Sequence, residues 1–276
     1  MSDPFLIKGP ALISFSGGRS SAYMLWRILQ AHGGTLPDDV KVTFANTGKE
    51  MPQTLDFVRD CGERWGVEII WLEYQTTKHP KDRWQRVSYE TASRKGEPFE
   101  AMVNKQAFLP TPAQRLCTEH LKIRPMKNYM ASLGFDEPDR VIGIRADEQH
   151  RVMRMRSHDD IVMPLATIGI TKHDVMGFWR RHGFDLKLTA VDGITLASNC
   201  DLCFMKGLTV IKALMRQNPE WADWWIRQEE RTGHQFHRDR QPYRVLAAQV
   251  SDQIDMGFPD ILADDGIVDC FCGDGG

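Results

Sequence analysis

Serines, glycines and one arginine are concentrated in residues 14–24, SFSGGRSSAYM. An apolar run, Ala11–Ile13, precedes them, and apolar residues recur at helical spacing from Ser20 to Ala31. A strand that enters a helix through glycines and serines leaves backbone N–H groups free at the positive end of the helix dipole. The stretch therefore predicts a phosphate site, although such turns also use glycine and a serine cap for geometry alone.

Cysteines offer a second chemistry. Cys200 and Cys203 form a C-x-x-C pair, and Cys117 lies three residues before His120. Thiolates at this spacing can bind one metal ion. Two metal sites remain open: zinc held by all four side chains, or an iron–sulfur cluster held by the three cysteines. Buried free thiols are the alternative without a metal.

Another cysteine, Cys272, lies in a C-terminal stretch rich in glycine and aspartate, DCFCGDGG. A thiol on a mobile tail could enter an active site, attack a sulfur atom and leave again to meet a reductant. An inert tail is the alternative. The stretch therefore indicates a possible nucleophile whose role depends on the rest of the chain.

Composition limits the class of protein. The chain has 276 residues, 42% hydrophobic and 26% charged, with a net charge of −2. This balance neither favours nor excludes nucleic acid as a partner, but arginines gather in residues 145–156 and basic residues in 115–127. The N-terminus resembles no signal peptide and no run is long enough to span a membrane, so we expect a cytoplasmic protein.

Strand-like and helix-like segments alternate over the first two thirds of the chain. This alternation predicts a Rossmann-like α/β fold, a parallel sheet with helices on both faces. We divide the chain into a nucleotide-binding α/β domain, 1–195, and a mainly helical C-terminal region, 196–276. The expected strands are 11–13, 42–45, 67–72, 141–144 and 161–165, and the expected helices are 20–31, 53–65, 113–133, one after Thr171, 207–217 and 219–231.

Three polar segments directly follow expected strands. They are residues 16–21, 46–50 and 145–151. In an open parallel sheet, ligands bind at the carboxyl ends of the strands, so we expect these segments to form one cleft.

Several motifs together resemble the phosphoadenosine phosphosulfate (PAPS) and adenosine phosphosulfate (APS) reductase family, within the adenine nucleotide α-hydrolase-like (PP-loop) superfamily. The resemblance covers about residues 11–206 and the tail. Its motifs occur in the family's order: SFSGGRSSAYM, FANTGKEMPQT, RLCTEHLKIRP, GIRADEQHR, MPLATIGITKHDV, NCDLC and the terminal DCFCGDGG.

The resemblance implies a role for each matching residue. The phosphate loop would comprise Ser14, Ser16, Gly17, Gly18, Arg19, Ser20 and Ser21, with Thr47 and Gly48 nearby. Arg145 and Arg151 would contact phosphate or sulfate oxygens, for which a guanidinium is a suitable donor. Cys117, Cys200 and Cys203 would hold a [4Fe–4S] cluster, and Cys272 would take up the sulfonyl group, later released as sulfite by thioredoxin.

Two departures favour other readings. Thr118 replaces the second cysteine of an adjacent pair found in cluster-bearing APS reductases, and the Ser-Gly-Gly loop is closer to ATP-splitting, sulfur-transferring relatives. The leading expectation is reduction of PAPS or APS to sulfite. The alternative is an ATP-dependent sulfurtransferase that adenylates a nucleic acid or small molecule, and the third is a non-catalytic nucleotide or nucleic-acid binding protein. We also expect a homo-oligomer.

Overall fold

The computed structural model describes residues 3–188, 190–191, 194–195, 197–198 and 200–255. Its central feature is a six-stranded sheet with the strand order β4-β3-β2-β1-β5-β6. Neighbouring strands run parallel, except that β4 is antiparallel to β3. The strands are β1 (Ala11–Ser14), β2 (Val40–Asn46), β3 (Ile69–Glu73), β4 (Gln85–Val87), β5 (Asp139–Ile142) and β6 (Ile161–Val162).

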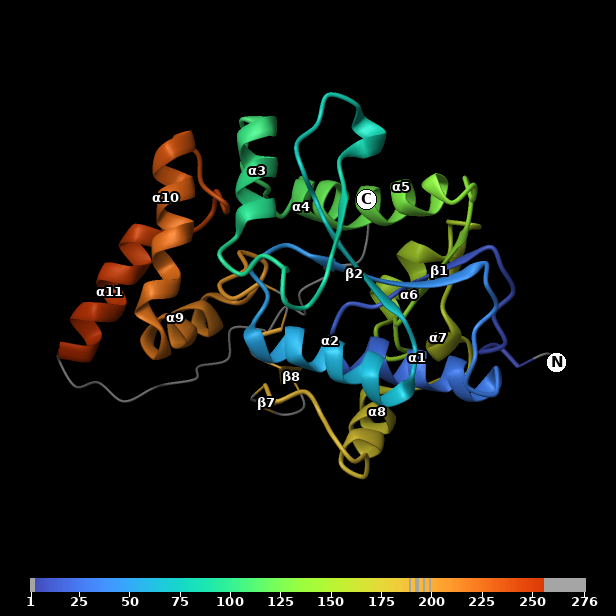
Figure 1. Cartoon of the computed structure of the whole chain (residues 1–276). Coiled ribbons are helices and arrows are strands. Elements are labelled where there is room, and N and C mark those ends of the chain that lie inside the picture. Colours follow the sequence, from blue (N-terminus) through green and yellow to red (C-terminus); the bar gives the residue numbers. More distant parts are fainter. Residues whose placement is uncertain (1–2, 189, 192–193, 196, 199, 256–276) are drawn as a thin grey trace.

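Helices cover both faces of the sheet (Figure 1). Alternate side chains of a strand point to opposite faces, and the core follows this rule. Ile13, Val42 and Phe44 belong to the main core cluster with α1 (Arg19–Ala31) and α2 (Pro52–Trp65). Leu12, Ala45, Ile70 and Leu72 instead pack with Met126, Tyr129 and Met130 of α5 (Arg124–Ser132) on the other face.

The segment that leads into α5 changes its helical winding. It begins as α4 (Leu116–Thr118), continues as a π-helical turn, η2 (Glu119–Ile123), and becomes α5 without a break. Wide π turns of this kind are frequent at functional sites. The sequence predicted one helix over 113–133, and the structure has these three elements in its place.

The C-terminal part is helical and lies beside one end of the sheet (Figure 1). Phe99, Trp224, Trp225, Phe236 and Tyr243 pack against one another and join it to α3 (Glu97–Gln106). The remaining elements are η1 (Pro80–Asp82), α6 (Gln149–Met155), α7 (Pro164–Thr167), α8 (Lys172–Trp179), β7 (Ala190–Val191), β8 (Ile194–Thr195), α9 (Leu208–Gln217), η3 (Pro219–Trp221), α10 (Ala222–Thr232) and α11 (Tyr243–Asp255).

The predicted α/β fold class, with a helical C-terminal part, is confirmed. The strand expected over 161–165 was wrong in its second half, because Pro164 begins the short helix α7. Helix α11, strand β4 and the β7–β8 hairpin were not predicted. The domain division 1–195 and 196–276 stays a prediction. Among the described residues, no helix has the length and apolar character that crossing a bilayer requires.

Candidate functional site

The loop between β1 and α1 has a shape that only glycine accommodates easily. Gly17 has φ of 74°, in the left-handed region that favours glycine. A Cβ atom there would lie 2.7 Å from Cγ2 of Thr54 in α2. Gly18 is the N-cap of α1 and offers no side chain to the first turn. The first backbone N–H groups of α1 are therefore open to an external anion.

Ser21 fixes the shape of this loop from within. Its Oγ donates to the carbonyl oxygen of Gly18 (3.0 Å), accepts from the backbone N–H of Ser16 (3.2 Å) and lies 2.9 Å from Oγ of Ser16. Ser14 contributes a weaker contact, from its Oγ to Sδ of Met126 at 3.9 Å. Ser21 is buried, and its side-chain contacts lie within the loop. Ser21 therefore stabilises the shape of the loop.

Arg19 joins the loop to a distant segment. Its Nε and Nη2 contact the two carboxylate oxygens of Asp185 at 2.7 and 2.9 Å, and Nη2 also donates to the carbonyl oxygen of Leu186 at 2.6 Å. Nε1 of Trp179 donates to the carbonyl oxygen of Arg19 at 3.0 Å. The planar guanidinium suits this paired contact. In this geometry Arg19 holds the start of α1 in place.

Arg145 reaches the phosphate loop from the neighbouring strand. It follows β5, which pairs with β1, and its Nη1 donates to Oγ of Ser20 at 3.0 Å. The two segments lie close together, because a Cβ on Gly143 would be 2.9 Å from Cα of Ser21. The structure therefore brings together the loop and the arginine that the sequence placed at one cleft.

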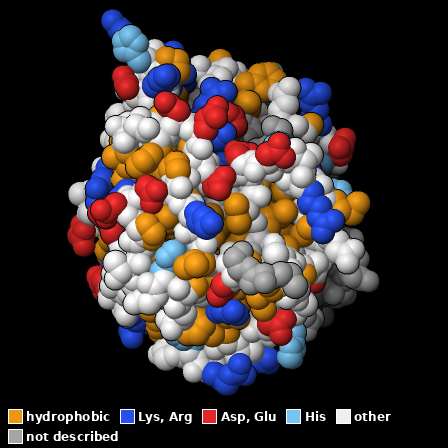
Figure 2. Space-filling view, turned by 90° about the vertical axis from the view of Figure 1, so that its right-hand side faces the viewer, with side chains coloured by type: hydrophobic (Ala, Val, Ile, Leu, Met, Phe, Trp, Pro, Cys, Tyr) orange, Lys and Arg blue, Asp and Glu red, His pale blue; other side chains and the backbone are white. Residues whose placement is uncertain are grey.

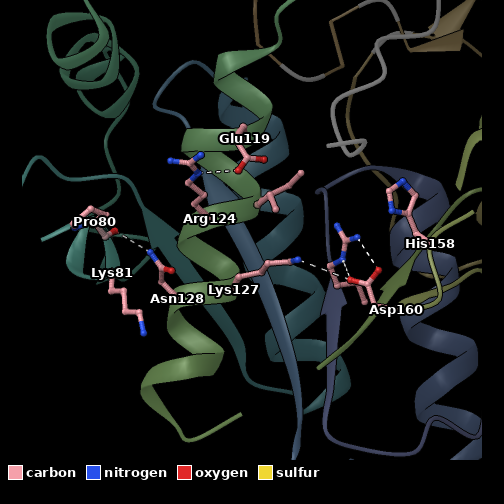
Figure 3. A pocket seen from close by; sticks show the side chains of 10 residues that line it. Pro80, Lys81, Glu119, Arg124, Lys127, Asn128, His158 and Asp160 are labelled. Carbon is pink, nitrogen blue, oxygen red and sulfur yellow. Dashed lines mark hydrogen bonds and ion pairs between the residues drawn. The ribbon is translucent and has the colours of Figure 1, made fainter. Parts of the chain in front are cut away.

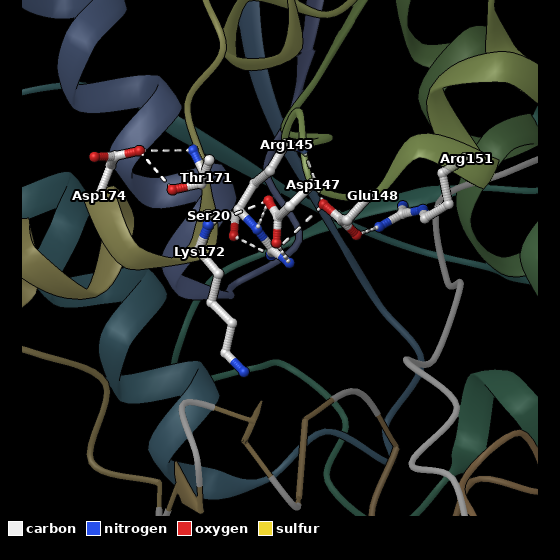
Figure 4. A network of polar contacts seen from close by, with 8 residues as sticks. All are labelled: Ser20, Arg145, Asp147, Glu148, Arg151, Thr171, Lys172 and Asp174. Atoms are coloured by element: carbon white, nitrogen blue, oxygen red, sulfur yellow. Dashed lines mark hydrogen bonds and ion pairs between the residues drawn. The ribbon is translucent and has the colours of Figure 1, made fainter.

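Carboxylates surround the arginines of this site (Figure 4). Nε of Arg145 lies 3.0 Å from Oδ1 of Asp147, and the backbone N–H of Arg145 donates to Oε2 of Glu148 at 2.9 Å. Nη1 of Arg151 forms an ion pair with Oε1 of Glu148. Asp147 also accepts from the backbone N–H of Lys172 at 3.1 Å. An incoming anion would have to share or replace these carboxylate contacts.

The turn after β2 is built around a buried glutamate. The carboxylate of Glu50 accepts two hydrogen bonds from Thr47, one from its backbone N–H at 2.8 Å and one from the Thr47 hydroxyl, Oγ1, at 2.8 Å. Burial raises the pKa of Glu50, and the charge of Lys122 and the hydrogen bonds from Thr47 oppose this rise. Gly48 has φ of 78°, and a Cβ there would lie 3.0 Å from Cα of Gly96. These contacts hold Thr47 and Gly48 in place directly after the carboxyl end of β2.

The cysteine pair packs against this same turn. Cys200 forms an isolated antiparallel bridge with Glu50, and its Sγ lies 3.5 Å from Oγ1 of Thr47. Lys49 and Asp201 form a buried ion pair at 2.7 Å, and Nε1 of Trp225 donates to Oδ1 of Asp201 at 2.8 Å. The structure therefore brings Cys200 next to Thr47, which the sequence did not predict.

The predicted metal ligands do not form a metal site in the structure. Cys200 and Cys203 are buried, and Cys117 is half-buried. His120 is buried, its Nδ1 lies 3.5 Å from Nε2 of Gln106, and burial lowers its pKa. Across the part of the chain that the structure describes, no three His, Cys, Asp or Glu side chains are grouped to hold a metal ion. The described residues therefore support neither a zinc ion nor an iron–sulfur cluster.

The predicted nucleophile, Cys272, lies outside the described residues. Sequence reasoning also missed five charged residues that organise the site. Their partners are far away in the chain or lie in loops, so local spacing gives no signal for the pairs. The best available signal in the sequence was chain position, since Asp147 and Glu148 lie close after Arg145 in a segment that follows an expected strand. These residues are Lys49, Asp147, Glu148, Asp185 and Asp201.

Comparison with known proteins identifies the family. Residues 10–186 match the phosphoadenosine phosphosulfate reductase domain. The chain belongs to this family. The matched region contains the phosphate loop, the Thr47 turn, Arg145 and Arg151, and it ends at Leu186, whose carbonyl oxygen binds Arg19.

Curated relatives of this family member are uncharacterized. A nin region protein of Escherichia phage lambda is 30% identical over 201 residues, 71% of this chain and 66% of its own length. Two proteins of Methanocaldococcus jannaschii are 30% and 26% identical over 153 and 117 residues, 55% and 42% of this chain. The chain spans about two thirds of the phage protein and about a quarter of the archaeal ones.

Proposed function

We propose that this protein is an enzyme that binds an adenine nucleotide by its phosphates at residues 16–21. One observation carries the proposal: Nη1 of Arg145 contacts Ser20 beside the open N-terminus of α1, at 3.0 Å. A helix N-terminus and a guanidinium at one point provide both backbone and charged donors for phosphate or sulfate oxygens. Arg151, in helix α6 of the same segment, is a second donor for the same anion.

For the reaction, we propose thiol-dependent reduction of PAPS or APS. The thiolate of Cys272 attacks the sulfur of the sulfuryl group, the bond between this sulfur and the bridging phosphate oxygen breaks, and the nucleotide phosphate leaves. A dithiol protein such as thioredoxin then attacks Sγ of Cys272. Sulfite leaves with the electron pair of the S–S bond, and the dithiol is oxidised to a disulfide through a mixed disulfide with Cys272. The family and the tail cysteine support this reaction.

A second candidate function is ATP-dependent transfer of sulfur to a nucleic acid or small molecule. Two observations favour it. The carboxylates of Asp147 and Glu148 lie beside the loop, where they would suit a nucleotide that brings its own divalent cation. The thiol of Cys200 lies against Thr47, in the turn that follows β2. A third possibility, nucleotide or nucleic-acid binding without turnover, needs neither thiol.

The decisive experiment compares the products from three nucleotides. Under anaerobic conditions, the protein is incubated with PAPS, APS or ATP, with thioredoxin as reductant and nucleic acid as a possible acceptor for the ATP reaction. Sulfite and pyrophosphate are both measured. We expect sulfite from PAPS or APS, and we expect the variant Cys272→Ala to release none because it lacks the attacking sulfur.

Each other result points to a different function. Pyrophosphate from ATP that survives Cys272→Ala but is lost in Cys200→Ala would contradict the reductase and favour sulfur transfer. Nucleotide binding without either product would favour the binding protein. Arg156→Ala serves as a control for non-specific effects of a substitution. Arg156 is an exposed arginine at the end of α6, the helix that carries Arg151.

A further inference from the structure

A second pocket lies on the face of the sheet that α5 covers (Figure 3). Its volume is about 490 Å³, within the range of small-ligand sites. We call it the α5 pocket and define it by six charged residues that line it: Lys81, Arg124, Lys127, Arg140, Glu119 and Asp160. None of these residues belongs to the candidate site described above.

Both arginines of the α5 pocket form close ion pairs, and Lys127 forms a longer one. Arg140 binds both carboxylate oxygens of Asp160, with Nε at 2.7 Å and Nη2 at 3.2 Å. Nε of Arg124 lies 2.7 Å from Oε1 of Glu119. The hydrogen bond from Arg140 lowers the pKa of Asp160, which keeps this carboxylate charged. These pairs fix the walls of the pocket without removing its excess of positive charge.

The excess charge resides on two lysines. Lys127 reaches from α5 toward Asp160, but only to 3.9 Å from Oδ2, and Lys81 makes no ion pair with any described residue. Both lysines are exposed, and Figure 3 draws them on opposite sides of α5. Ammonium groups on opposite sides of one helix are placed to contact separate anionic groups. They suit a ligand with successive negative charges along its length.

We propose that the α5 pocket binds the phosphate backbone of a nucleic-acid strand, with Lys81 and Lys127 contacting different phosphates. Lysine acts on phosphate as a flexible point charge, so it needs no fixed geometry. Asn128 holds the Lys81 turn against α5, because its Nδ2 donates to the carbonyl oxygen of Pro80 at 3.1 Å. The turn that carries Lys81 is therefore fixed relative to Lys127.

The small number of lysines limits the extent of this contact, since only Lys81 and Lys127 supply the excess positive charge of the α5 pocket. On the face drawn in Figure 2, basic and acidic side chains are interspersed, with no extended area of one sign. The strand is held through few phosphates, and salt weakens its binding accordingly. This inference stands apart from the proposed function, since binding at the α5 pocket requires neither the phosphate loop nor either reaction.

Fluorescence anisotropy of a labelled single-stranded oligonucleotide of about 20 residues tests this inference on the intact chain. The affinity is measured at about 50 and about 200 mM salt, the range over which phosphate contacts weaken most visibly. The double variant Lys81→Ala/Lys127→Ala removes the two lysines. Its matched control, Lys95→Ala/Lys105→Ala, removes the same charge from exposed positions at the start and end of the α3 region.

We expect the double variant to bind at least about tenfold more weakly at the lower salt. Loss of two phosphate contacts should also reduce the slope of log affinity against log salt by about 1.4, since each contact to a single strand contributes about 0.7. The control should change the affinity by less than about twofold. Arg145→Ala should leave strand binding unchanged while it weakens nucleotide binding, which separates the two sites.

Three results would overturn the inference. The intact protein does not bind the oligonucleotide, the double variant and its control bind equally, or free AMP competes fully with the strand in the intact protein and in Arg145→Ala alike. The last result would assign the pocket to a mononucleotide. If strand binding is retained while no nucleotide binds the loop, the proposed function fails and the α5 pocket stands.

Discussion

Arg145 contacts the phosphate loop, and carboxylates from its own segment already pair with Arg145 and Arg151. This pairing keeps two nearly buried guanidinium groups compensated when no nucleotide is bound. An anion with more charge than one carboxylate can displace these contacts, because it offers more oxygen atoms to the same donors. At the proposed nucleotide site, these carboxylates would therefore favour a multiply charged ligand over a singly charged one.

Replacement of Arg145 by alanine should weaken nucleotide binding. A hydrogen bond to a charged group contributes about 1.5–3 kcal/mol, so we expect the dissociation constant to rise by about 10- to 100-fold. Calorimetric titration with the nucleotide measures this change. Arg156→Ala removes an exposed arginine of the same segment and should leave the constant within about twofold; equal weakening by both variants would contradict the role of Arg145.

Gly17 allows a second test at this scale, because Gly33 provides a matched control. Both have positive φ, 74° and 65°, but a Cβ on Gly33 meets no atom within 4 Å. Gly33→Ala should lower the free energy of unfolding by about 1–2 kcal/mol, the backbone penalty alone. Gly17→Ala adds the clash with Thr54 and should cost at least about 1 kcal/mol more. Chemical denaturation compares the two, and equal losses would show that the loop relaxes freely.

At the scale of elements, the sequence predicted the helices in which apolar residues recur with a clear helical period. Helices α1 and α2 begin and end within about a residue of their expected positions. Helix α8 begins after Thr171 as expected, and Thr171 and Asp174 form its capping box. Residues 164 and 165 were misassigned because a short apolar run fits a strand and a helical turn equally well. The π turn was not predictable, since it depends on packing against the rest of the chain.

The same limit applies to the candidate site. Its glycines and Arg145 follow strand ends, where topology alone brings them together. The contact of Cys200 with Thr47 joins positions 153 residues apart, so neither period nor spacing indicates it. Spacing within each pair of candidate metal ligands likewise says nothing about the distance between pairs, and among the described residues no group of three such ligands is found.

The ion pair of Lys49 and Asp201 joins the turn after β2 to the cysteine segment. Asp201→Ala leaves a buried ammonium unpaired and removes the acceptor of Trp225, which should lower the free energy of unfolding by about 3–5 kcal/mol. Urea denaturation measures this loss. Glu68→Ala breaks the exposed pair with Arg86 and should cost less than about 1 kcal/mol. Similar losses in both variants would contradict a structural role for the buried pair.

For the whole molecule, one core cluster includes residues from β1 through α11. Ile13 of the sheet and Leu246 of α11 belong to the same cluster, so the sheet and the C-terminal helices share apolar packing. Charged contacts follow the same pattern, as Arg19 with Asp185 and Lys49 with Asp201 show. Stability and site geometry are therefore properties of the described chain as one unit.

The pH dependence of stability should include a contribution from Asp160. Its pKa is lowered in the folded protein, mainly by the hydrogen bond from Arg140, so its contribution is present above the unfolded value of about 3.9. The contribution is lost as the pH falls through the lower, folded value. Because Asp160 is partly exposed, we expect at most about 1 kcal/mol. Urea unfolding of the wild type and Asp160→Asn at about pH 6 and pH 2.5 tests this, and identical pH dependence would contradict it.

The buried ion pair between Lys49 and Asp201 also has a consequence for the exchange of gene segments that encode this domain. Lys49 lies inside the matched region, 10–186, whereas its partner lies beyond it and is held in turn by Trp225. A gene fragment cut at the boundary of the matched region would encode a domain with an ammonium group left without its counterion. Recombination that keeps this ion pair together with its support from Trp225 must therefore carry the codons into α10, beyond the matched region.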